Sequence, residues 1–288
     1  MKNWKRILVA VLLLTIVGFI GWSVVYAGRQ NNVQKVSTAK VTKQSITATV
    51  TTTGTIIPTR SAALTGSGLV TAVNVKVNDK VTKGQVLATY NGTTNLTSPI
   101  AGTVTAVNIL AGQADTAQAT GKPAITVADL SNLRVQLNLT KSEAAQVKVR
   151  QPVHMNYLDH TYTGDMASVD PTAATTTSAT GASTPTLGAQ VTFDRQPQGL
   201  VPGFDIDVRI TVATADQAIT IPQEAITYDR NNDPLVYRIV KNKAVRTAVT
   251  TGLQSATRIA VSKGLSAGDR VVLSPSSKIH DGTAVTTQ

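Results

Sequence analysis

The chain contains no cysteine, and aromatic residues make up only 4% of its 288 residues. The absence of cysteine excludes disulfides, thiolate metal sites and thiol nucleophiles. The scarcity of aromatic rings argues against a platform on which bases or sugars stack. Only 3 histidines and 16 acidic residues are present, and none forms a pair or cluster spaced for acid–base or metal chemistry. The composition therefore indicates a protein that is not an enzyme and holds no cofactor or metal.

The net charge of +11 comes from basic residues that are scattered along the chain and form no long run. Nucleic-acid-binding proteins usually gather such residues into a patch or stripe, so we expect no nucleic-acid partner. Attraction to an anionic surface is the simpler consequence of this charge.

Residues 7–27 form an uncharged apolar run that follows Lys2, Lys5 and Arg6. A helix of about 21 residues spans roughly 31 Å, which matches the hydrocarbon core of a bilayer. The basic N-terminal flank predicts a cytoplasmic N-terminus, and hence a single-pass protein of the cell membrane with its body outside. We assign residues 1–28 to a cytoplasmic stub and transmembrane anchor. A cleaved signal peptide is the alternative, although its apolar region is typically shorter.

Residues 64–131 contain one motif written twice. The first copy begins at Gly68 and reads Gly-Leu-Val-Thr-Ala-Val-Asn-Val, and the second begins at Gly102 and reads Gly-Thr-Val-Thr-Ala-Val-Asn-Ile. Each copy continues through short β-rich runs and turn signals. Neither half can bury a face alone, so we expect the two to pair into one small sandwich. Residues 91–97 link the halves and are long enough for little more than a turn.

The rest of the body also reads as β-structure, because Thr, Val, Ala and Ile dominate it. Residues 140–149 are the exception and predict a short helix, with Thr140 as its cap and Glu143 three residues later. Residues 172–186 consist almost entirely of small and hydroxyl residues without periodicity and predict a mobile loop.

Five ordered blocks, together with the repeat, resemble the membrane fusion protein (periplasmic adaptor, HlyD-type) family. The blocks begin at Ser98 (SPIAGTVT), Ile125 (ITVADLSNLRV), Leu200 (LVPGFDIDVRI), Ile221 (IPQEAI) and Gly264 (GLSAGDRVV). The resemblance implies a lipoyl-like domain (barrel-sandwich hybrid) over 64–131, a β-barrel over 132–213, and a membrane-proximal β domain from 36–63 and 214–288. The structural positions that this assigns are Gly68, Gly84, Pro99, Gly102, Gly112, Pro202 and Gly203.

Three departures from related proteins qualify the resemblance. Biotinyl and lipoyl carriers present a lysine at the tip between the halves, whereas this tip reads Asn91, Gly92, Thr93, Thr94, Asn95. Most adaptors insert a long α-helical hairpin there to reach an outer-membrane channel, so no such channel is expected as a partner. Arg150 stands where the family usually has glycine, which puts the turn after the short helix in question.

The resemblance implies a non-catalytic adaptor subunit of an ABC-type efflux complex. Its partners would be a permease with its ATPase, and its copies would form a ring. In this branch of the family the loop after the second half-motif lines the lumen, which here assigns Gln113, Gln118 and Thr120 to a gate. Gln118 as an ordinary exposed loop residue is the alternative.

Two other functions stay open at this point. One is an envelope binding or structural module that keeps the adaptor fold without a transporter. The other is a hydrolase that uses Asp159 and His160, for which the sequence offers no nucleophile motif.

Overall fold

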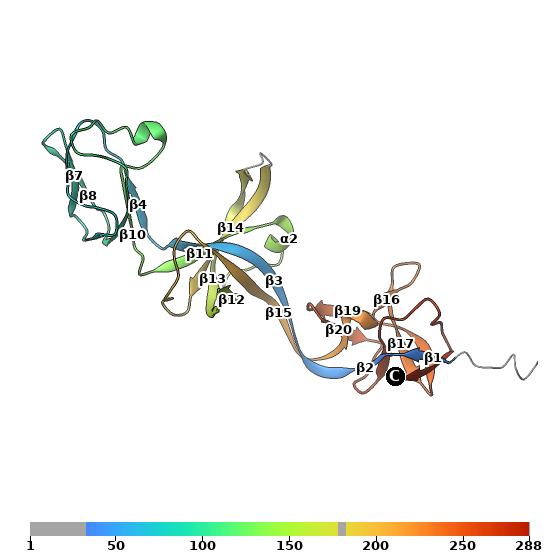
Figure 1. Cartoon of the computed structure of the whole chain (residues 1–288). Helices are drawn as coiled ribbons and strands as arrows, with labels where there is room; N and C mark the ends of the chain where they lie inside the picture. Colours follow the sequence, from blue (N-terminus) through green and yellow to red (C-terminus); the bar gives the residue numbers. More distant parts are fainter. Residues whose placement is uncertain (1–32, 178–182, 288) are drawn as a thin grey trace, which may run out of the picture. The chain divides into compact units, whose positions relative to one another are not determined.

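The computed structural model describes residues 33–177 and 183–287, and Figure 1 labels many of its elements. Strands dominate these residues, which confirms the prediction of a mainly β protein. The described residues divide into two compact units, one made of residues 33–47 and 214–287 and the other of residues 48–177 and 183–213. The predicted anchor lies outside the described residues. Among those that are described, no helix has the length and apolar character needed to cross a membrane.

The repeated stretch forms a sandwich of two small sheets. Its strands are β4 (Ser61–Leu64), β5 (Val70–Val73), β6 (Lys80–Val81), β7 (Val86–Tyr90), β8 (Thr94–Thr97), β9 (Gly102–Val107) and β10 (Ile125–Ala128). One sheet has the order β4-β10-β9-β6 and the other β5-β7-β8. Because β6 of the first copy pairs with β9 of the second, the two copies complete one sheet together, as the repeat predicts. Between the sheets lie Val70, Leu87, Val104, Ile125 and Val127, all fully buried.

The glycines that begin the two copies are required for different reasons. Gly68 has φ +105, a conformation that residues with a Cβ rarely adopt. Gly102 has an ordinary φ, but a Cβ there would lie 2.5 Å from the carbonyl oxygen of Ala128. Glycine is therefore needed in the first copy because of its backbone conformation, and in the second copy because there is no space for a side chain.

A closed barrel occupies the remainder of the second unit. Its strands are β3 (Thr42–Pro58), β11 (Leu133–Leu139), β12 (Pro152–Tyr157), β13 (His160–Thr177), β14 (Ser183–Phe193) and β15 (Asp205–Pro222). Two of these strands, β3 and β15, continue into the first unit. The barrel strands follow the order β12-β13-β14-β11-β3-β15, and pairing of β12 with β15 closes the ring. Closure removes the unpaired edges that invite aggregation. The interior is apolar and includes Ile56, Val135, Leu137, Met155, Val191 and Ile210.

Two sequence predictions in the barrel are corrected. Residues 172–177 and 183–186 are strand rather than loop, because the long β13–β14 hairpin continues through pairs such as Ala173–Leu187 and Thr177–Ser183. Helix α2 (Lys141–Ala144) is shorter than expected, although the predicted capping box of Thr140 and Glu143 is present.

The turn after α2 keeps its shape despite the missing glycine. Arg150 adopts φ 67, and its backbone N–H donates to the Met166 carbonyl at 2.8 Å. The surrounding hydrogen bonds therefore hold an arginine in a left-handed conformation that glycine would adopt without strain.

The first unit is a second β domain in which the N-terminal strands join C-terminal ones. It contains β1 (Gln34–Val36), β2 (Thr38–Lys40), β16 (Thr227–Tyr228), β17 (Pro234–Val240), β18 (Lys243–Ala248), β19 (Thr250–Gln254), β20 (Arg258–Lys263), β21 (Arg270–Val272) and β22 (Thr283–Thr287). Strand β1 runs parallel to β22, and β2 pairs with β21. One cluster of buried side chains, Val41, Ile221, Val236, Val249, Val261 and Val271 among them, forms its main core.

Candidate functional site

The tip of the sandwich is a tight hairpin that joins β7 to β8. Asn91 and Gly92 have φ 51 and 76, as expected for an Asn-Gly turn between paired strands. Thr94 pairs with Tyr90 and Asn95 with Thr89, so both belong to β8 and the linking turn is residues 91–93 alone. The predicted link is thus shorter than residues 91–97, because its second part completes the hairpin.

The loop proposed from the sequence as a gate, residues 113–123, is called the Gln118 loop below. Its centre is a single 3-10 turn, Gln118–Thr120, which ends at Gly121 in the left-handed conformation. Gln113, Gln118 and Thr120 are all exposed. Two backbone hydrogen bonds of 2.9 Å attach the start of the loop to the first copy of the repeat. The Val70 N–H donates to the Gln113 carbonyl, and the Asp115 N–H donates to the Gly68 carbonyl.

A pocket of about 380 Å³ brings part of the tip and part of the Gln118 loop together. Its lining consists of Thr65, Gly66, Ser67, Tyr90, Thr94, Asn95, Leu96 and Gln118. Thr94 and Asn95 from the predicted tip therefore share a surface with Gln118. Asn91, Gly92, Thr93, Gln113 and Thr120 do not line it. The lining carries hydroxyl and amide groups and no charged side chain, which suits neutral hydrogen-bonding contacts.

Tyr90 is the residue of this site that the sequence did not reveal. It is 2% exposed, and its hydroxyl donates a hydrogen bond of 2.7 Å to Oδ2 of Asp115. Burial, followed by the Asp115 hydrogen bond and charge, raises the pKa of the Tyr90 hydroxyl above its usual range. The phenol therefore stays a donor at physiological pH. In a chain with few aromatic residues, a tyrosine at the end of a strand could have indicated a buried position. Its partner Asp115 could not be predicted, because it lies 25 residues away in the chain.

The other singled-out positions shape turns. Gly84 and Gly112 have φ 85 and 83, and Pro99 follows the buried Ser98 just before β9. The Pro202-Gly203 turn precedes β15, and its Gly203 N–H donates to the Ile56 carbonyl at 2.8 Å.

The histidine of the hydrolase alternative lies at a hairpin turn. Asp159 and His160 lie where β12 turns into β13, and the His160 ring centroid is 6.4 Å from that of Tyr162. In the described part of the chain, no three metal-ligating side chains cluster.

Comparisons with known proteins agree with this architecture. MacA from Actinobacillus actinomycetemcomitans superposes with a TM-score of 0.68 at 21% identity, over 82% of this chain and 99% of that chain. A MacA-MexA chimera that contains the α-hairpin domain of Pseudomonas aeruginosa MexA follows with a TM-score of 0.64 at 20% identity, over 82% and 100%. The chain has the fold of a membrane fusion protein, or periplasmic adaptor. Residues 218–287 of this adaptor fold also match the family model of the YknX C-terminal permuted SH3-like domain. Curated protein sequences gave no match.

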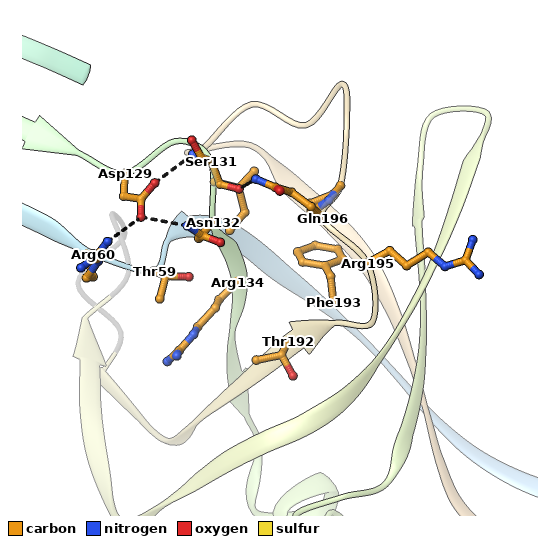
Figure 2. A pocket seen from close by; sticks show the side chains of 12 residues that line it. Thr59, Arg60, Asp129, Ser131, Asn132, Arg134, Thr192, Phe193, Arg195 and Gln196 are labelled. Carbon is orange, nitrogen blue, oxygen red and sulfur yellow. Dashed lines mark hydrogen bonds and ion pairs between the residues drawn. The ribbon is translucent and has the colours of Figure 1, made fainter. Parts of the chain in front are cut away.

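Within the adaptor fold, a buried carboxylate ties together the two chain segments that connect sandwich and barrel. Figure 2 shows Asp129 accepting hydrogen bonds from Asn132 Nδ2 at 3.0 Å, Ser131 N at 3.1 Å and Arg60 Nη2 at 3.2 Å. The Asn132 hydrogen bond, more than the Arg60 and Ser131 contacts, holds the pKa of Asp129 below its ordinary value. Backbone hydrogen bonds from Asp129 to Arg60 and from Thr59 to Asn132 complete the connection.

A pocket of about 400 Å³ adjoins this carboxylate, with Arg134, Phe193 and Arg195 in its lining. Its arginines do not converge on one point, because Arg60 faces Asp129 while Arg195 points away from it (Figure 2). The arrangement therefore fits a structural junction better than an anion site. It gives a physical role to Ile125–Val135, one of the blocks that carried the family resemblance.

Proposed function

We propose that the chain is the extracytoplasmic adaptor subunit of an ABC-type efflux complex. Residues 7–27 anchor it in the cell membrane, and the body guides substrate away from the permease without catalysing a reaction. The observation that carries this proposal is the MacA-like fold, which extends over 82% of this chain. The adaptor's partners are the permease, its ATPase and further copies of the chain in a ring.

The Gln118 loop is the part of the adaptor that we assign to contact with substrate. It offers an exposed amide beside an uncharged pocket. Polar side chains that face a narrow passage can select or delay what moves through it. Support comes from the anchoring of the loop to the first copy of the repeat, since a gate must hold a defined position.

The short tip supports an adaptor that works without an outer-membrane channel. Residues 91–93 are a turn at the position where most members of the family carry a helical hairpin. A three-residue turn cannot extend to a distant partner, because an extended residue spans at most about 3.6 Å.

Affinity capture tests the assembly. The full chain, solubilised from membranes in mild detergent, should retain a permease and an ATPase, and native mass spectrometry should show several copies of the chain. Repeated recovery of the chain alone would favour the alternative, an envelope module that kept the adaptor fold without a transporter. The short tip is the observation that favours this alternative.

A substitution tests the loop. Gln118→Ala should change export rate or selectivity several-fold while leaving the amount of captured complex unchanged. Gln146→Ala is the matched control, because Gln146 is exposed in the barrel and outside the pocket. Equal export by both variants and the unmodified chain would remove Gln118 from the proposal.

A further inference from the structure

Within the Gln118 loop, the segment Ala117–Lys122 makes only one hydrogen bond to a side chain outside itself among the described residues, and Asp115 is the acceptor of that bond. Among the described residues, Ala117–Lys122 make hydrogen bonds only within the segment or to Thr116 and Asp115. The Thr120 hydroxyl and the Lys122 N–H both donate to the Ala117 carbonyl, at 2.8 and 2.9 Å. The turn is therefore closed by its own hydrogen bonds. On its N-terminal side it is connected to the sandwich through Asp115, and directly after its C-terminal side Asn108 Nδ2 donates to the Pro123 carbonyl at 2.8 Å.

Asp115 uses both carboxylate oxygens for this connection. Oδ1 accepts the backbone N–H of Ala117 at 2.9 Å, and Oδ2 accepts the Tyr90 hydroxyl at 2.7 Å. Ala117, which is 4% exposed, also packs into the core of the sandwich. One carboxylate thus joins the residue that begins the turn to a tyrosine in the hairpin strand.

Tyr90 itself has little freedom. It ends β7, it is paired with Thr94 across the hairpin, and a Cβ on Gly66 would come within 2.2 Å of its ring. Its hydroxyl therefore has a fixed position. Asp115, which accepts from this hydroxyl and from the Ala117 N–H, is thereby held in place and fixes the start of the turn.

We propose that Tyr90 and Asp115 are positioning residues that hold Gln118 in the lining of the pocket of about 380 Å³, beside Thr94 and Asn95. Loss of their hydrogen bond releases the closed Gln118–Thr120 turn as one piece while the sandwich stays folded. The position of Gln118 follows from the structure alone, and its consequence for export rests on the proposed function.

Hydrogen exchange on the purified, detergent-solubilised full chain tests the proposal without a transporter. Tyr90→Phe keeps the ring in the core and removes only the hydroxyl. Amide exchange in residues 117–122 should rise about tenfold or more, the equivalent of losing a hydrogen bond to a charged acceptor. Exchange in β9 should stay unchanged. Tyr162→Phe is the matched control, because its hydroxyl donates to the Gln198 carbonyl at 2.8 Å in the barrel.

Two results would overturn the proposal. One is unchanged exchange in residues 117–122. The other is an equal rise in β9, which would show that the hydroxyl supports the whole sandwich. A double variant adds a second test: Tyr90→Phe should add nothing once Asp115→Ala is present, since both remove the same connection.

Measurements of export by the Tyr90→Phe and Gln118→Ala variants distinguish the positioning role from the proposed gate. With faster exchange in the loop, Tyr90→Phe should alter export in the same direction as Gln118→Ala. If neither variant alters export although exchange rises, the positioning role stands and the proposed gate fails.

Discussion

Replacement of Asp129 by alanine should weaken the junction between sandwich and barrel more than any change to its arginine partner. Asp129 is 7% exposed, and its carboxylate accepts hydrogen bonds from Ser131, Asn132 and Arg60. Truncation leaves these donors without their acceptor at a position where water has little access. The surrounding backbone connections through Thr59 and Asn132 remain.

The size of the effect follows from the three contacts. A hydrogen bond to a charged group contributes about 1.5–3 kcal/mol, and the Ser131 and Asn132 contacts are of this kind. The Arg60 side chain is 63% exposed, so its ion pair contributes at most about 1 kcal/mol after screening by solvent. Because coupled contacts are not additive, we expect about 2–4 kcal/mol for Asp129→Ala. Asn132→Ala should cost more than Arg60→Ala.

Native-state hydrogen exchange across residues 125–139 measures the free energy of opening locally, which suits a chain of two units better than a global melting curve. The pKa of Asp129 is lowered in the folded state, so the charge stabilises the junction fully above the ordinary carboxyl pKa of about 4. This contribution should decline as the pH falls through the lowered value. The difference between the unmodified chain and Asp129→Asn should shrink over the same range.

An Asp129→Ala effect below about 0.5 kcal/mol, which is within the range of an ordinary surface substitution, would contradict a structural role for this carboxylate. The ranking of its partners would be refuted if Arg60→Ala cost more than Asn132→Ala, since exposure would then be a poor guide to the contribution of each partner.

Three further predictions concern local backbone. Arg150→Gly should raise the free energy of local unfolding by about 0.5–1 kcal/mol, because φ 67 strains an arginine but not a glycine. Hydrogen exchange of the backbone amide at position 150 measures this change. A lower free energy of local unfolding in the variant would contradict the strain. Gly102→Ala should lower the urea midpoint of the sandwich by the equivalent of about 2 kcal/mol or more, because its Cβ would lie 2.5 Å from the Ala128 oxygen. Thr140→Ala should cost about 1 kcal/mol by loss of the capping box with Glu143, measured by exchange in α2, and an unchanged rate would show that the cap is dispensable.

Local turn chemistry and the repeat were the most informative parts of the sequence. The Asn-Gly tip, the pairing of the two copies and the Thr140 cap depend on neighbouring residues or on a pattern that can be read twice. Residues 172–177 and 183–186 were misread because a Thr- and Ala-rich segment resembles a loop by composition. Their hairpin forms because threonine favours strands and because β13 and β14 are already aligned by the barrel below them.

Residue type, order and spacing are sufficient to predict a mainly β chain, a doubled sandwich and a tip that carries neither a lysine nor a long insertion. The folded structure was needed to find that Tyr90 contacts Asp115, that Arg60 and Asn132 share Asp129, and that Gln118 lines a pocket with Thr94 and Asn95. The physical reason is that each of these contacts joins residues far apart in the chain. Their distances depend on strand register and sheet packing, which no local pattern encodes.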